Sequence, residues 1–91
     1  MRWQEKIPNG KLVSVEVWVG DERVEKVRIT GDFFLHPEEK IDEIERSLEG
    51  LPVSSDDAEV RAKIEAALEN AELVGVSAED LARIFRRAVK G

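Results

Sequence analysis

The fold is decided by residues 11–30, which read KLVSVEVWVGDERVEKVRIT. Valine fills every second position from 13 to 19. Because successive side chains of a strand point to opposite faces, this alternation predicts a strand with one apolar face. The valine face is expected to lie against the core. The other face carries the intervening residues, which are Leu12, Ser14, Glu16 and Trp18.

The rest of that stretch and the residues before it predict two more strands. Residues 20–23, Gly-Asp-Glu-Arg, predict a hairpin turn in which the glycine and the aspartate take the unusual backbone angles. Alternation resumes over residues 24–30, with Val27 and Ile29 on the apolar face. Residues 2–7 predict a shorter strand, joined to the next by Pro8-Asn9-Gly10, since Asn-Gly readily takes positive φ. Its expected common face holds Trp3, Glu5 and Ile7.

The remaining two thirds of the chain predict three helices. Pro37 suits a first helical position, the carboxylates of Glu38 and Glu39 favour the positive end of the helix dipole, and Gly50 is expected to end this helix. One of residues 54–56 caps the second helix, and Ser77 with Asp80 predicts a short capping box for the third, after a break at Gly75. The expected buried stripes are Ile41, Ile44 and Leu48; then Val60, Ile64, Ala67 and Leu68; then Leu81, Ile84, Phe85 and Ala88.

Strands first and helices after predict an α+β fold, in which three helices pack on one face of a three-stranded antiparallel meander. Residues 1–91 are expected to form a single domain, with the sheet at about 1–30, a turn at 31–36 and helices at about 37–90. So small a core leaves little room for a deep substrate pocket.

Composition excludes several classes of function. The net charge of −6 disfavours a nucleic-acid partner, because an acidic chain is repelled by phosphates. The absence of cysteine excludes disulfides and thiolate chemistry. The sequence has no apolar run that suits a membrane span or a signal peptide, so a cytoplasmic location is expected. Abundant Glu, Lys and Arg are typical of a thermophilic source.

The sequence also lacks the side chains of a self-contained catalyst. Neither of the common phosphate-binding glycine motifs occurs, and His36 is the only histidine, so no metal-binding histidine pair exists. The acidic pairs at 38–39 and 56–57 stand at helix starts, where carboxylates are favoured electrostatically. The basic cluster of Arg83, Arg86, Arg87 and Lys90 suits the last turns of a helix in the same way. No catalytic residue and no metal site are therefore predicted.

One connecting segment stands out, TGDFFLHPEE at residues 30–39. Gly31 permits a sharp bend, and Asp32 can accept hydrogen bonds from the amides that the bend frees. Adjacent phenylalanines on an extended segment point in opposite directions, so the core takes only one of Phe33 and Phe34. The segment is either a turn anchored by a core aromatic or a contact surface for a partner.

Three stretches together resemble the C-terminal accessory domain of bacterial and archaeal lipoate-protein ligases. They are residues 10–13, residues 29–38 with the GDFF turn and the Pro-Glu helix start, and residues 48–50. In some archaea that domain is a separate short chain. This sequence is similar to such a free-standing subunit over nearly its whole length.

The resemblance implies an α+β fold distantly like the iron–sulfur scaffold proteins, although their ligating cysteines have no counterpart here. It implies a non-catalytic subunit that acts with a large catalytic subunit, which carries the lipoate and nucleotide sites, in the ATP-dependent formation of lipoyl-adenylate. Acceptor proteins would then receive the lipoyl group on a lysine. The complex would use lipoate, ATP and Mg²⁺, with no cofactor bound by this chain alone and no membrane or nucleic acid involved.

The site residues expected on this basis form a turn that faces the partner's active site, composed of Gly31, Asp32, Phe33, Phe34 and His36. Lys11 is expected to be either a phosphate or interface contact or a solvated strand-end lysine. Leu12 and Trp18, on the outer face of the sheet, are candidates for a further interface. The alternative function is a small interaction or scaffold module unrelated to lipoate, with the sheet face serving a homo-oligomer.

Overall fold

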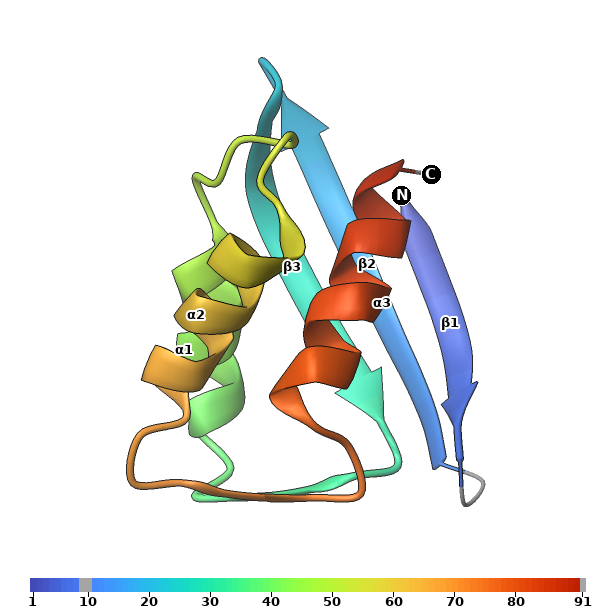
Figure 1. The fold of residues 1–91 in the computed structure, drawn as a ribbon, viewed down its shortest axis with the longest axis vertical. Coiled ribbons are helices and arrows are strands. Elements are labelled where there is room, and N and C mark those ends of the chain that lie inside the picture. The colour runs from blue at the N-terminus through green and yellow to red at the C-terminus, as the bar shows by residue number, and fades with distance from the viewer. Residues whose placement is uncertain (9–10, 91) are drawn as a thin grey trace.

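The computed structural model describes residues 1–8 and 11–90. Its main sheet is an antiparallel meander in the order β1-β2-β3 (Figure 1). The strands are β1 (Arg2–Ile7), β2 (Lys11–Gly20) and β3 (Arg23–Gly31). The predicted meander is confirmed, while the turn assigned to Pro8-Asn9-Gly10 includes residues 9–10, which lie outside the described residues. The alternation in β2 has the expected sense, because Val13, Val15 and Val17 are fully buried.

The β2–β3 turn corrects one detail of the sequence interpretation. Positive φ falls on Asp21 (53°) and Glu22 (61°), the two residues between the paired Gly20 and Arg23. A two-residue turn with both central residues at positive φ matches the right-handed twist of the flanking strands. Gly20 was expected to take one of these angles and does not. The carboxylate of Glu25, the end of a flexible side chain, occupies the space beside Gly20.

Three helices follow the sheet, as predicted: α1 (Lys40–Leu48), α2 (Asp57–Ala67) and α3 (Ala78–Lys90). Asp56 caps α2 in a reciprocal capping box with Glu59, and Ser77 and Asp80 exchange two 3.0 Å bonds before α3. α1 begins at Lys40 and not at Pro37. The preceding turn instead has hydrogen bonds three residues apart, such as Lys40 N to Pro37 O at 3.1 Å. Gly50, at φ 86°, follows α1 as expected.

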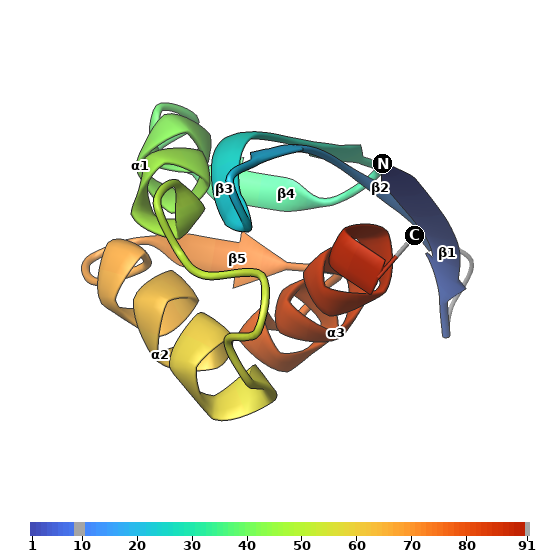
Figure 2. The same ribbon diagram turned by 90° about the horizontal axis from the view of Figure 1, so that it is seen from above.

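The helices lie on one face of the sheet and enclose a single core, which confirms the predicted fold class. α1 packs beside β3, α3 packs across β1 and β2, and α2 packs against the other two helices (Figure 2). Each predicted stripe contributes to this core, and Ile44, Leu48, Val60, Ile64 and Ile84 are fully buried. No helix in the described part of the chain is long and apolar enough to cross a membrane.

A second, two-stranded sheet occupies the segment that was expected to be only a turn. Residues 34–36 form β4 (Phe34–His36), which pairs antiparallel with β5 (Glu72–Val74), a strand that was not predicted. Leu35 faces Leu73 across this ribbon, and both pack against the core. The ribbon closes the end of the core at which β3 ends and α3 begins (Figure 1).

Candidate functional site

The β4–β5 ribbon presents an apolar surface at this end of the molecule. Phe34 and Val74 are opposite each other in the ribbon, and each is 54% exposed. Their neighbours along the same outward face are His36 and Glu72. We call this surface the ribbon end, and it comprises Lys11, Phe33, Phe34, His36, Glu72, Val74 and Gly75.

The two adjacent phenylalanines divide as the sequence predicted. Phe33 is half-buried and packs against the core, whereas Phe34 points outward. The exposed Phe34 ring stacks on the ring of His36, with centroids 6.3 Å apart and planes inclined by 7°. A shallow hollow of about 160 Å³ lies beside Phe34, and Leu35, Glu38 and Ile41 contribute to its lining. An exposed aromatic ring held beside a hollow is suited to packing against another protein.

Gly31 and Asp32 build the bend that leads from the sheet to the ribbon. A Cβ on Gly31 would lie 2.5 Å from the carbonyl oxygen of Leu12, so only glycine fits this close approach of two backbones. The Asp32 backbone N–H donates to the same oxygen at 2.9 Å. The sequence predicted that the Asp32 carboxylate accepts hydrogen bonds from turn amides. Within the described residues it accepts none, and the residue is exposed, so its charge faces solvent.

The structure brings Lys11 to the ribbon end. The Lys11 Cγ lies 3.7 Å from the position that a Cβ on Gly75 would take, and Phe33 lies at the same distance. Gly75 itself has φ 99°, which turns the chain from β5 towards α3. The Lys11 side chain therefore lies close to Gly75 and Phe33. The sequence missed Val74, Glu72 and Gly75 as neighbours of these residues, since a three-residue strand leaves too weak an alternation.

Leu12 and Trp18 lie towards opposite ends of the outer face of β2. They are 38% and 39% exposed and six positions apart on β2, which is about 20 Å along a strand. Leu12 lies next to the Gly31 bend and thus adjoins the ribbon end. Trp18 lies near the β2–β3 turn, where the Lys26 ammonium sits 5.1 Å from the centre of its ring. Trp18 already has a cationic neighbour from its own chain.

Ion pairs join β1 to α3 behind the ribbon end. Arg83 donates to Glu5 Oε2 at 2.6 Å and to Asp80 Oδ1 at 3.0 Å. The hydrogen bond from Arg83 holds the pKa of Glu5 below its ordinary value of 4.5, although partial burial raises it. Partial burial acts to raise the pKa of Asp80. Hydrogen bonds from Ser77 and Arg83 have the opposite effect, and together they hold the pKa below its ordinary value of 3.8. The hydrogen bond to Glu5 raises the pKa of Arg83. The basic cluster of the last helix thus does more than complement the helix dipole.

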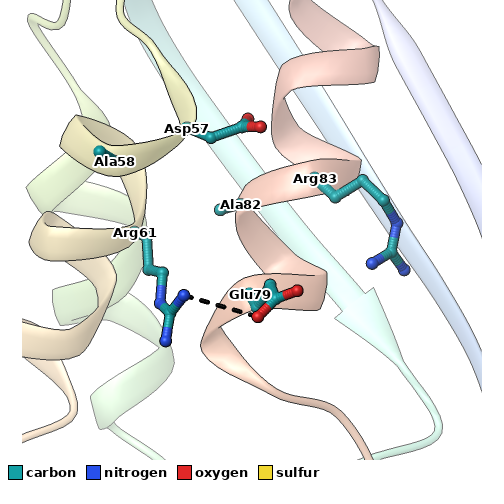
Figure 3. A pocket seen from close by; sticks show the side chains of 6 residues that line it. All are labelled: Asp57, Ala58, Arg61, Glu79, Ala82 and Arg83. Carbon is teal, nitrogen blue, oxygen red and sulfur yellow. Dashed lines mark hydrogen bonds and ion pairs between the residues drawn. The ribbon is translucent and has the colours of Figure 1, made fainter.

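A polar groove of about 410 Å³ runs between α2 and α3 (Figure 3). Its charged side chains are paired within the chain: Arg61 reaches Glu79 at 3.5 Å, and Asp57 lies 3.4 Å from Arg86. Figure 3 shows Arg83 directed away from α2, towards the sheet. The groove therefore offers balanced charges over a floor of Ala58 and Ala82, and does not select a charged ligand.

Within residues 1–8 and 11–90, no three carboxylate or imidazole side chains converge in a way that can hold a metal ion. The ribbon end has an exposed aromatic ring, an exposed aliphatic residue and a lysine side chain close to Gly75.

Comparisons with known proteins agree with the resemblance that the sequence motifs suggested. A chain in a solved archaeal lipoylation system from Thermoplasma acidophilum, described as a bi-partite lipoate protein ligase and its E2 lipoyl domain, is similar in structure. The TM-score is 0.71 at 26% sequence identity, and the match covers 93% of this chain and 90% of that one. A search of curated proteins found no match. The family model for the bacterial lipoate protein ligase C-terminus matches residues 1–85, so the chain belongs to this family.

Proposed function

We propose that this chain is the accessory subunit of a bipartite lipoate-protein ligase. In this role it joins a large catalytic subunit and is required for the ATP-dependent formation of lipoyl-adenylate, before the lipoyl group passes to an acceptor protein. Family membership over residues 1–85 supports the link to lipoate. The similarity to a chain of nearly the same length from a bi-partite system supports a free-standing subunit.

The observation that carries the proposal is the ribbon end. Single exposed apolar residues are common on proteins, but Phe34 and Val74 are both more than half exposed and lie opposite each other on adjacent strands, so they form a joint apolar surface. Phe34 would anchor the subunit in a recess of the large subunit, since aromatic side chains dominate small interfaces. The GDFF segment would then face the mobile loops around the nucleotide.

The contribution to chemistry is positional. Ordering a loop over the reacting groups excludes water, and charges act more strongly where water is excluded. Lys11, at the edge of the ribbon end, would direct a positive charge towards a phosphate of ATP held by the large subunit. ATP, lipoate and Mg²⁺ would be bound by that subunit.

The proposal is tested by reconstitution with the large ligase subunit from the same organism. We expect no lipoate-dependent release of pyrophosphate from this chain alone, and much faster release from the mixture than from the large subunit by itself. Asp32→Ala and Phe34→Ala should reduce the stimulation, and Lys11→Ala should raise the KM for ATP. A mixture no more active than the large subunit alone would overturn the accessory role.

A further inference from the structure

The two edges of the main sheet differ in how their backbone groups are satisfied. At the β3 edge, the Ile29 N–H donates to Glu45 Oε2 of α1 at 2.7 Å. Farther along the same edge, Val24 exchanges bonds with the α1–α2 loop: its N–H donates to Leu51 O at 2.9 Å, and Gly50 N–H donates to its carbonyl at 2.7 Å. The β3 edge is therefore covered by the chain itself.

The β1 edge has no such cover among the described residues. Met1 and Val17 exchange two hydrogen bonds, of 2.7 and 3.0 Å, which fixes the alternation of the β1–β2 ladder. The N–H and C=O groups of Arg2, Gln4 and Lys6 consequently point away from β2, and no partner for them occurs in residues 1–8 and 11–90. Figure 1 shows β1 as the outermost element on this side of the molecule.

Positive charge lines this open edge on both faces of the sheet. Arg2 and Lys6 lie on the outer face, and the Arg2 side chain bonds to the uncharged oxygens of Ser14 and Gln4. On the helix face, Arg87 sits 5.2 Å from the centre of the Trp3 ring. The one carboxylate of β1, Glu5, is paired with Arg83. Along the uncovered edge of its main sheet, a chain of net charge −6 thus presents the cations Arg2 and Lys6 on the outer face, with Glu16 of β2 opposite Arg2.

This charge pattern disfavours a second copy as the occupant. If β1 paired antiparallel with β1 of another copy about Gln4, each Arg2 would face a Lys6. Like charges directly opposite each other destabilise a strand pair. An incoming strand with carboxylates at alternate positions would instead meet Arg2 and Lys6 favourably.

The open edge is also continuous with the ribbon end. Ile7, the last residue of β1, is paired with Lys11, which belongs to the ribbon end. A partner that covers Phe34 therefore lies next to the uncovered backbone of β1.

We propose that the β1 edge binds an extended, acidic segment of the catalytic subunit as a fourth strand of the sheet. Backbone hydrogen bonds would give affinity, and the flanking cations would select a segment with carboxylates at alternate positions. This inference rests on the proposed function, from which it takes the identity of the partner.

The test compares Gln4→Pro with Gln4→Ala. The Gln4 N–H points away from β2, so proline removes no bond of the ladder but blocks an added strand. We expect the affinity for the large subunit to fall about tenfold with Gln4→Pro, the effect of losing one or two backbone hydrogen bonds, and to change less than about twofold with Gln4→Ala. Circular dichroism establishes that both variants are folded.

A second pair of variants tests the charge without altering the backbone. Lys6→Glu should weaken binding and reduce its dependence on salt, whereas Lys63→Glu on the exposed face of α2 should do neither. If wild-type protein stimulates the large subunit while Gln4→Pro and Lys6→Glu bind as tightly as wild type, the edge proposal is overturned and the accessory role stands. If wild-type protein does not bind the large subunit, both are overturned.

Discussion

The exposed aromatic residues near the two ends of β2 have different surroundings. At the hairpin end, Trp18 is covered in part by Lys26, and the Arg23 side chain is tied to Gly50 O by a 2.9 Å bond. At the ribbon end, Phe34 stacks only on the edge residue His36 and lies beside Val74, which is as exposed as itself. Phe34 and Val74 at the ribbon end are each 54% exposed, more than Trp18 at the hairpin end, which is 39% exposed. This difference favours the ribbon end as the surface that a partner covers.

The largest expected effect comes from the glycine that forms the bend into the ribbon. Gly31→Ala places a Cβ 2.5 Å from Leu12 O, a backbone atom that cannot move aside cheaply. We expect the free energy of unfolding in urea to fall by about 2 kcal/mol or more. The matched variant near the hairpin end is Gly50→Ala, where φ is 86° but nothing lies within 4 Å. Its cost should be about 1 kcal/mol. Equal losses would show that the close approach at Gly31 does not matter.

The second prediction compares the aromatic residues of the two ends directly. Phe34→Ala should weaken binding of the large subunit about thirtyfold, as expected for a buried aromatic anchor, and Trp18→Ala by about threefold or less. Isothermal titration calorimetry measures both affinities. A larger effect of Trp18→Ala would move the docking surface to the hairpin end.

The third prediction concerns the ion pairs behind the ribbon end. The pKa values of Glu5 and Asp80 are lowered in the folded chain from 4.5 and 3.8, so the unfolded chain binds more protons in that range. Their contribution to stability is therefore complete above about pH 4.5 and is lost as the pH falls through the folded-state values. Glu5→Gln should cost about 0.5 to 1 kcal/mol at pH 7, since the pair is partly exposed, and should flatten the decline of stability in acid. If the free energy of unfolding of Glu5→Gln declined in acid as steeply as that of the wild-type chain, the stabilising role of the ion pair would be contradicted.

The smallest effect is expected at the hairpin end. Lys26→Ala removes the ammonium from the Trp18 ring and should lower the free energy of unfolding by about 0.5 kcal/mol, as for an exposed cation–π contact. In a Trp3→Phe background, the fluorescence of Trp18 should also change. Lys63→Ala, which carries no such contact in the described residues, serves as the control. A fluorescence spectrum identical to that of the parent would argue that Lys26 does not sit on the ring.

Regular patterns predicted most of the fold. The valines of β2 and the cap residues Asp56 and Ser77 indicate structure through local spacing alone, and their elements formed as expected. The ribbon was missed because β4 and β5 have three residues each, too few to show alternation, and their partners lie far apart in sequence. The positive φ of Glu22 was missed because the turn length imposes that angle on a residue that does not prefer it.

The long sequence separation of β4 and β5 also explains why only some residues of the candidate site were identified from the sequence. Phe33, Phe34 and Lys11 were identified from the sequence, and the structure brings them to one end. Val74 and Gly75 were not identified from the sequence, since their proximity to Phe34 depends on the path of the segment between α2 and α3. Leu12 and Trp18 were identified from their common outer face on the ten-residue strand β2, and their use as an interface stays a prediction.

The ribbon also has a consequence for assembly in the cell. Phe34 and Val74 come from segments forty residues apart, and they meet only when β4 and β5 pair. The joint apolar surface is therefore formed only when β4 and β5 have paired. A partner that recognises this surface would bind only those chains in which the ribbon has formed.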